Sequence, residues 1–306
     1  MYGSQNRACK ILATGMKGAP VAAQRKSDGV ALANGADERM YFVDKGKGSV
    51  MLAAERRNLI LEKLQQEGKV VVSELSELFG VSEETIRRDL EKFDKDGIAT
   101  KTYGGAVLVE DTNTDMPFNI RRKTNMQGKR IIGSIIEKLV SDGESIIVDP
   151  STTAVAIMKA LRSKKNLTVI TNSIEVLIEL TDVSGWDIIS TGGNLKENYL
   201  ALVGPRAVDT IAAFNADKVI LSCKGLDMQK GITDANELFT QVKKNMLASA
   251  KQKILAVDRT KFNRIAFSQI CSITDLDIVV TDVKPSEEWL RYFEEKGIKC
   301  LYGEEH

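Results

Sequence analysis

The stretch VSEETIRRDL, residues 81–90, decides the fold of the first part of this chain. Its apolar residues recur with the spacing of one helix face at Ile86 and Leu90, and the pattern continues to Phe93. Gly97 follows at the place where a glycine in the left-handed conformation ends a helix. The stretch therefore predicts a surface helix that buries a single face.

A shorter helix and a strand pair are predicted on either side of this stretch. Residues 73–79 carry apolar side chains at helical spacing, and a tight turn at 79–81 joins them to the second helix. Ser73 and Ser82 are placed to cap the two helices, because a serine oxygen accepts a hydrogen bond from a free N–H at a helix start. Residues 98–107 follow as a strand pattern with a Gly-Gly turn. Helix, turn, helix and β wing are the elements of a winged helix-turn-helix, a module that reads DNA.

The exposed face of the second helix indicates which side chains would meet DNA. It holds Glu84 and Arg88, and an arginine that binds guanine with two hydrogen bonds is the commonest specific contact. The alternative is that Arg87 and Arg88 are solvated charges, paired at helical spacing with Glu83, Glu84 or Glu91. The turn, the caps and the wing together favour DNA. We expect a DNA interface that contains Arg56, Ser73, Ser82, Glu84, Thr85, Arg87, Arg88, Lys92, Lys101 and Tyr103.

The charge of this module argues against strong non-specific binding. Residues 53–110 contain nine Lys and Arg residues and twelve Asp and Glu residues. Attraction to phosphate must therefore come from the placement of single cations rather than from bulk charge. Arg56 and Arg57 open a first helix predicted for residues 54–67, and Lys101 lies at the wing. We expect modest non-specific affinity and a dependence on dimer formation.

These residues resemble the N-terminal signature of DeoR-type bacterial transcription regulators. The resemblance rests on VSxxTIRRDL at 81–90, on Gly97 and on the sequence Tyr-Gly-Gly-Ala at 103–106. It continues through the rest of the chain and covers about residues 52–302. It implies a winged helix-turn-helix domain at residues 52–109.

Length and composition set the limits for the whole chain. The 306 residues suggest two domains, with enough apolar content for a core that is stable without disulfide bonds. Four scattered cysteines, Cys9, Cys223, Cys271 and Cys300, show no ligand spacing, so we expect no metal, no cofactor and no disulfide framework. This fits a reducing cytoplasm. A run of eighteen apolar residues is absent, and we therefore expect no membrane span.

The first fifty residues match nothing in the family. They are rich in Gly, Ala and Lys and have no clear helical or strand period, so we expect a disordered and dispensable extension at 1–50. The functional alternative is an arm that contacts DNA through Arg7, Lys10, Lys17, Arg25 and Lys26.

After a polar linker at 110–126, helices and strands alternate through residues 127–303. The predicted helices span 127–140, 152–161, 173–180, 205–214, 237–250 and 287–296, and the predicted strands span 145–148, 167–170, 187–190, 218–221, 254–257 and 277–280. Helices that alternate with continuously apolar strands predict a layered α/β domain with a largely parallel sheet. Such sheets bind ligands at the carboxyl ends of their strands.

Polar residues gather where five of these strands end. Hydroxyls at helix N-termini donate to anions, glycines admit close backbone approach, and carboxylates and amides bind sugar hydroxyls. Any one segment is more simply explained by helix capping, but five together favour a ligand site. With two further residues, Asp234 and Lys243, the candidate set is Asp149, Ser151, Thr152, Thr153, Thr171, Asn172, Ser173, Gly192, Gly193, Lys224, Gly225, Asp234, Lys243, Asp258 and Lys261.

These segments also resemble the DeoR-type C-terminal sensor, which is similar in fold to sugar-phosphate isomerases and CoA-transferases. The motif D-x-G/S-T-T falls on 149–153, GITDANE on 231–237 and D-x-x-K-F on 258–262. Ser151 stands where glycine is frequent, which narrows the anion pocket but keeps its donors. The resemblance implies a repressor of a carbohydrate catabolic operon that binds operator DNA as a homodimer or homotetramer and is released by a phosphorylated sugar.

The competing class is a sugar-phosphate isomerase-like enzyme with an accessory DNA-binding domain. Its base would have to be a carboxylate such as Asp149, Asp234, Glu237 or Asp258, because the single histidine is His306 at the end of the chain. The intact DNA module favours sensing over catalysis, and we expect no enzyme activity.

Overall fold

The computed structural model describes residues 29–34, 37–44, 52–108 and 118–304. Residues 1–51 and 52–306 form two units, which are described separately. In the first unit, β1 (Gly29–Asn34) and β2 (Asp37–Asp44) pair as antiparallel strands. This hairpin corrects the expectation of disorder for that part of the extension. The basic residues of the arm considered above lie outside the described residues.

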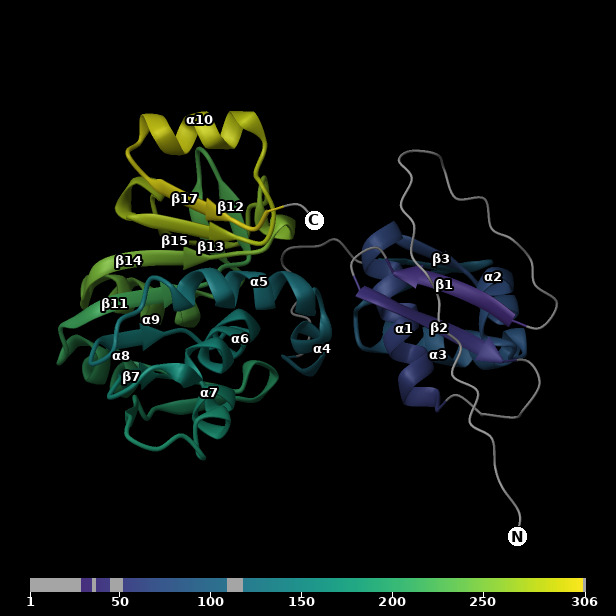
Figure 1. The fold of residues 1–306 in the computed structure, drawn as a ribbon, viewed down its shortest axis with the longest axis horizontal. Helices are drawn as coiled ribbons and strands as arrows, with labels where there is room; N and C mark the ends of the chain where they lie inside the picture. Colours follow the sequence, from purple (N-terminus) through teal and green to yellow (C-terminus); the bar gives the residue numbers. More distant parts are fainter. Residues whose placement is uncertain (1–28, 35–36, 45–51, 109–117, 305–306) are drawn as a thin grey trace, which may run out of the picture. The chain divides into compact units, whose positions relative to one another are not determined.

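The second unit begins with the expected winged helix-turn-helix (Figure 1). Its core is made of the apolar faces of the three helices, where Ile60, Leu75 and Ile86 are fully buried. Gly97 has a φ of 66°, and the N–H of Ile98 donates to the carbonyl of Phe93 at 2.8 Å, as in a glycine-ended helix. The elements are α1 (Ala53–Glu67), β3 (Lys69–Val71), α2 (Val72–Phe79), α3 (Glu83–Lys95), β4 (Ala99–Thr102) and β5 (Gly105–Leu108), with strand order β3-β5-β4.

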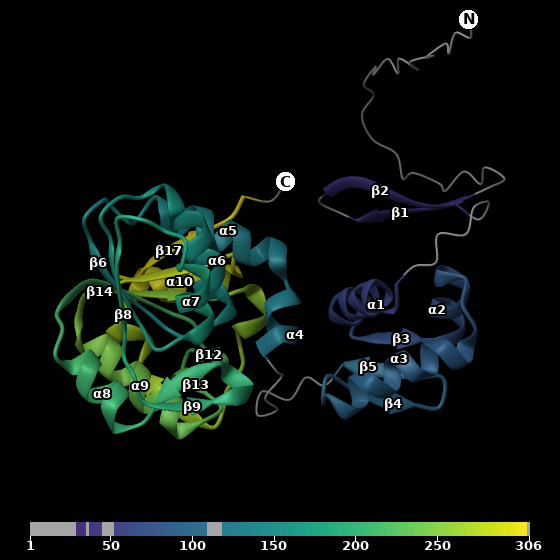
Figure 2. The ribbon, with the colours of Figure 1, turned by 90° about the horizontal axis from the view of Figure 1, so that it is seen from below.

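A parallel sheet of seven strands forms the centre of the following domain (Figures 1 and 2). Its order is β17-β16-β14-β11-β6-β7-β8. The strands are β6 (Ser145–Val148), β7 (Thr168–Thr171), β8 (Asp187–Ser190), β11 (Ala216–Leu221), β14 (Ala250–Ala256), β16 (Ile278–Thr281) and β17 (Lys299–Tyr302). The predicted parallel α/β architecture is confirmed.

Helices cover both faces of this sheet. Neighbouring residues of each strand point to opposite faces, so each strand contributes apolar side chains to two cores. Ile146 and Val148 belong to the apolar core shared with the first group of helices, whereas Ile147 belongs to the core shared with the second. The first group is α5 (Met126–Glu137), α6 (Thr152–Ala160) and α7 (Ile174–Glu179), and the second is α8 (Pro205–Ala212), α9 (Glu237–Ala248) and α10 (Glu287–Glu295). The domain therefore has three layers.

The predicted linker at 110–126 is too long at its C-terminal end. Helix α4 (Phe118–Lys123) forms there, and Phe118 is 3% exposed within the core of the α/β domain. Arg122 also pairs with Glu175 of α7 at 3.1 Å. Within the described residues the α/β domain therefore begins at Phe118 rather than at residue 127.

Several short strands were not predicted. They form a hairpin of β9 (Asn194–Lys196) and β10 (Ala201–Val203), and a small antiparallel sheet of β12 (Gly225–Asp227), β13 (Gly231–Asp234) and β15 (Ser268–Cys271). The edge strand β17 was missed as well. These strands are three or four residues long.

Candidate functional site

Helix α3 presents the predicted faces. Ile86, Leu90 and Phe93 are buried at 0%, 1% and 5% exposure, while Glu84 and Arg88 extend into solvent. The hydroxyl of Ser82 accepts a hydrogen bond from the N–H of Thr85 at 3.3 Å, so Ser82 is the N-cap. A helix fixed in this way can enter a groove with its exposed face forward.

The two arginines of this helix also form the alternative pairs that the sequence allows. Arg87 contacts Glu83 at 2.9 Å and Arg88 contacts Glu84 at 3.3 Å. Exposed pairs of this kind contribute about 0.2–0.5 kcal/mol, whereas a base contact by arginine is worth about 1–3 kcal/mol. The pairs therefore do not prevent either arginine from turning to DNA.

Two expectations for the winged helix need correction: the DNA contact of Arg56 and the capping role of Ser73. Arg56 is 7% exposed, and its Nε donates to Asp89 at 2.6 Å, so it joins α1 to α3 inside the domain. Ser73 does not cap α2, because the helix begins at Val72 and its N-cap residue is Val71, which makes no side-chain cap. Ser73 is exposed in the first turn instead.

The wing keeps its two candidate residues accessible. Lys101 is exposed and Tyr103 is fully exposed at the turn between β4 and β5. The backbone N–H of Lys101 donates to the carboxylate of Asp94 at 3.0 Å, which ties the wing to α3. This hydrogen bond therefore fixes the position of the wing relative to α3.

In the α/β domain, the structure brings the five polar segments to one edge of the sheet. They follow β14, β11, β6, β7 and β8, which are consecutive neighbours in the sheet. The chain order reverses direction between β6 and β11, and open α/β sheets bind ligands at such a switch point. The N–H of Ser222, after β11, donates to Asp149, after β6, at 3.0 Å. We call the residues that follow these five strands the strand-end site.

Lys243 is already engaged within the strand-end site. Its Nζ lies 3.0 Å from Asp149 and 2.7 Å from Asp234, and it donates to the carbonyl of Ser222 at 2.7 Å. Burial would lower the pKa of Lys243, but the charges of Asp234 and Asp149 outweigh it and raise the pKa. This corrects the expectation that Lys243 is a cation available to a ligand.

Most of the polar side chains beside it also have structural partners. Ser151 caps α6 and Ser173 caps α7, and the hydroxyl of Thr171 donates to the carbonyl of Val148 at 3.0 Å. Asn172 donates to the carbonyl of Leu202 at 2.8 Å. Its Oδ1 is buried and accepts no hydrogen bond from the described protein atoms.

Thr152 and Thr153 differ from these residues. They are the first residues of α6 and are 7% and 4% exposed. Their hydroxyls make no hydrogen bond with the part of the chain that the structure describes, and they lie where the helix dipole favours an anion. They are therefore hydroxyl donors that are available to an anion.

Two glycines of the candidate set are needed for backbone packing. A Cβ at Gly193 would lie 2.6 Å from the carbonyl oxygen of Val203, and a Cβ at Gly225 would lie 2.3 Å from that of Arg264. Gly192 is exposed, with open space around it. The close approach at Gly193 and Gly225 serves the fold itself.

Two further cations, Arg121 and Lys129, were not among the predicted site residues, and they lie near the predicted Lys261. Lys129 of α5 is 5% exposed, and its Nζ donates to the carbonyls of Arg121 and Thr124 at 2.5 and 2.6 Å. Burial lowers its pKa to about 8; the charges of Lys261 and Arg121 act in the same direction, and that of Asp258 opposes them. Within the described residues, no carboxylate forms an ion pair with this buried ammonium.

Asp258 is the acid of this group. Burial would raise the pKa of Asp258, but Lys261, Lys129 and hydrogen bonds from Thr260 lower it overall. The guanidinium of Arg121 lies 5.1 Å from the ring centre of Tyr199, and the ammonium of Lys224 lies 5.9 Å from the same centre. We call Arg121, Lys129 and Lys261 the cation group. The signal for it was the basic run at 121–123 and a lysine on the otherwise apolar face of α5.

Sequence comparisons identify the family. The model described as "DeoR-like helix-turn-helix domain" matches residues 56–112, and the model described as "DeoR C terminal sensor domain" matches residues 124–283. The HTH-type transcriptional regulator YulB of Bacillus subtilis is 39% identical over 81% of this chain and 96% of its own length. The HTH-type transcriptional repressor GlcR of Bacillus subtilis is 31% identical over 83% of this chain and 98% of its own length.

The chain belongs to the DeoR family of transcriptional regulators. The glycerol-3-phosphate regulon repressor of Escherichia coli is 30% identical over 77% of this chain and 93% of its own length. Among solved structures, ribose 5-phosphate isomerase A of Methanocaldococcus jannaschii covers 45% of this chain and 55% of its own, with 15% identity and a TM-score of 0.34. In the described residues, no helix has the length and apolar character needed to cross a membrane.

Proposed function

We propose that this regulator represses a carbohydrate catabolic operon in the cytoplasm and is released from its operator by a phosphorylated sugar. The observation that carries the proposal is the buried ammonium of Lys129, which lies near Lys261 and Arg121 and forms no ion pair with a carboxylate among the described residues. A buried ammonium is costly without a counter-charge, and a bound anion supplies one.

A sugar phosphate fits the donors that remain. The hydroxyls of Thr152 and Thr153 and the N-terminus of α6 suit phosphate oxygens, and the cation group supplies charge. The Oδ1 of Asn172 has no hydrogen-bond donor among the described residues, and a sugar hydroxyl can donate to it. Lys243 is not part of this anion site, because its two carboxylates give its surroundings a net negative charge.

The names of two relatives agree with this proposal. One is a repressor of a glycerol-3-phosphate regulon, and GlcR is a transcriptional repressor. We propose no enzyme activity for this chain, since three of the four candidate bases are engaged and the fourth, Glu237, is exposed: Asp149 and Asp234 bind Lys243, and Asp258 accepts hydrogen bonds from Thr260.

A symmetric homodimer or homotetramer completes the proposal. One winged helix reads a short site, whereas a two-fold dimer doubles the contacts on a palindromic operator. Light scattering at micromolar protein measures the oligomeric state. A monomer that protects an extended repeated operator would contradict this part.

The function is tested in two steps. A thermal-shift screen compares sugar phosphates with the corresponding free sugars, because a ligand that binds the folded state raises its stability. The stabilising compound is then added to a titration of the protein with the DNA upstream of its own gene. The proposal predicts that a phosphorylated compound stabilises the protein and weakens DNA binding, and that its free sugar does neither. Equal effects of sugar and sugar phosphate would refute it.

A further inference from the structure

Most basic side chains of the winged helix have an acidic partner among the described residues. Within the described residues, four of its basic side chains pair with a glutamate one turn away: Lys63 with Glu67, Arg87 with Glu83, Arg88 with Glu84 and Lys95 with Glu91. Residues 53–110 carry more acids than bases. Binding to phosphate therefore depends most on cations that have no glutamate partner one turn away.

Asp89 holds two arginines with one negative charge. It is 4% exposed and accepts from Arg56 at 2.6 Å and from Arg57 at 3.2 Å. The side chain of Arg56 is buried, whereas that of Arg57 is 28% exposed. A guanidinium has five N–H donors, and this hydrogen bond uses one of those on Arg57. The excess positive charge of the group therefore lies at the surface, on a side chain that Asp89 keeps in place.

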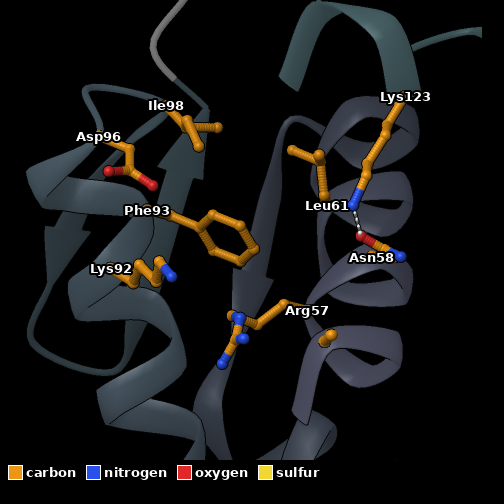
Figure 3. A pocket seen from close by; sticks show the side chains of 9 residues that line it. Arg57, Asn58, Leu61, Lys92, Phe93, Asp96, Ile98 and Lys123 are labelled. Atoms are coloured by element: carbon orange, nitrogen blue, oxygen red, sulfur yellow. Dashed lines mark hydrogen bonds between the residues drawn. The ribbon is translucent and has the colours of Figure 1, made fainter. Parts of the chain in front are cut away.

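Arg57 and Lys92 extend toward one another from α1 and α3 across a pocket of about 170 Å³ (Figure 3). Leu61, Phe93 and Ile98 give the pocket an apolar side, and Asp96 is its single acid. Lys92 forms no ion pair within the part of the chain that the structure describes. The full lining consists of Ala54, Arg57, Asn58, Leu61, Lys92, Phe93, Asp96, Ile98 and Lys123.

The pocket is placed beside the face that meets DNA. Lys92 follows Arg88 by one turn on α3 and shares its exposed face, so it lies toward the C-terminal end of the recognition helix. Arg57 lies in the first turns of α1, and the packing of α1 on α3 brings it to the same pocket as Lys92.

We propose that Arg57 and Lys92 together bind one phosphate of the DNA backbone. The guanidinium supplies a directional pair of donors and the ammonium a point charge. Asp89 acts as a positioning residue, since it fixes Arg57 before DNA arrives. The contact adds affinity and fixes the register of α3 without reading a base.

The test is the salt dependence of DNA binding by the full-length protein. The probes are a duplex of arbitrary sequence and the DNA upstream of the protein's own gene, between about 50 and 200 mM salt. Loss of one phosphate contact lowers the slope of log K against log salt concentration by about 0.9. We expect this change for the Arg57→Gln, Lys92→Gln double variant on both duplexes, with Arg57→Lys retaining the slope.

Lys63→Gln is the matched control, because it removes one charge from the same helix outside the pocket. It should leave the slope unchanged. The single variant Lys92→Gln shows whether a change in slope comes from a folding defect, because Lys92 does not contact Asp89. It should lower the slope while the melting temperature stays at the wild-type value. A double variant with the same slope and affinity as Lys63→Gln would overturn the proposal.

Discussion

Arg56 and Arg57 are neighbours in sequence and have different tasks in the structure. Arg56 stands four residues before Ile60, which in turn stands four before Leu64, so it continues the buried stripe of α1. This spacing could have excluded Arg56 from the DNA interface. Its partner could not have been predicted, because Asp89 is 33 residues away and becomes a neighbour through the packing of α3 on α1.

Arg88 is the residue that tests direct reading of DNA. Arg88→Ala should weaken specific binding by about 1–3 kcal/mol if the side chain contacts a base. The melting temperature should remain nearly constant, because the side chain is 75% exposed. Titration of operator DNA and thermal unfolding measure the two effects. If Arg88→Ala unfolds the protein and Ile86→Ala does not, the two faces of α3 are reversed.

Lys129 gives the ligand site a pH dependence. Its pKa of about 8 lies below the ordinary value of 10.5, so the folded protein without ligand loses this proton at lower pH than the unfolded chain does. Stability should therefore rise with pH between about 8 and 10.5 through this group. Binding of an anion needs the charged form. The affinity for the sugar phosphate found in the thermal screen should fall by roughly five- to tenfold between about pH 7.5 and pH 9.

Calorimetric titration across this pH range measures the effect. Lys129→Met should bind weakly at every pH and lose the dependence, while Lys138→Met, which removes an exposed lysine at the end of the same helix, should behave as wild type. The same pH profile in Lys129→Met would exclude Lys129 as the source.

The two threonines at the start of α6 separate ligand binding from DNA binding. Thr152→Ala with Thr153→Ala removes hydroxyls that have no partner among the described residues, so folding should be little affected. The double variant should bind operator normally and resist release by the ligand, since a ligand shifts an equilibrium only by binding one state more tightly. A DNA titration with and without ligand measures this. Release at the wild-type ligand concentration would disprove the assignment.

At the scale of elements, the alternation of helices with short apolar runs predicted the strands of the parallel sheet. The parallel strands β6, β8 and β16 are apolar runs, and each was predicted to within a residue. The hairpin of β1 and β2 was missed although Asn34 and Gly35 form a strong turn signal between two strand-like runs. The small sheet was missed because its pairing depends on β15, which lies more than thirty residues beyond β13.

The contact between α1 and α3 should be the most sensitive point of the winged helix. Asp89→Ala leaves Arg56 buried without its counter-charge, which costs roughly 3–5 kcal/mol in such cases. Thermal or urea unfolding should show this loss. Asp94→Ala removes an exposed acid from the same helix and should cost far less. If the two variants are equally stable, the buried pair does not hold the helices together.

At the scale of the whole chain, α4 and α5 join the two functions. Residues 110–126 were predicted to be a linker, yet Arg121 of this segment belongs to the cation group together with Lys129 of α5. The signal was weak because a basic run before a helix is typical of solvated connections. In the proposed function, α4 and α5 hold the anion of the effector, and they are the first helices that follow the winged helix in the chain.

The division of the chain also predicts that residues 1–50 are dispensable. They belong to a unit separate from residues 52–306, and the family match begins at residue 56. A chain that begins at Met51 should therefore unfold at the same temperature and bind operator with the same affinity as the full chain. DNA titration at matched salt measures the second quantity, because phosphate contacts depend steeply on ionic strength. A loss above about tenfold, or roughly 1.4 kcal/mol, would show that the N-terminal unit contributes to binding. Arg7 and Lys10, together with Lys17, Arg25 and Lys26, would then be the residues to replace first.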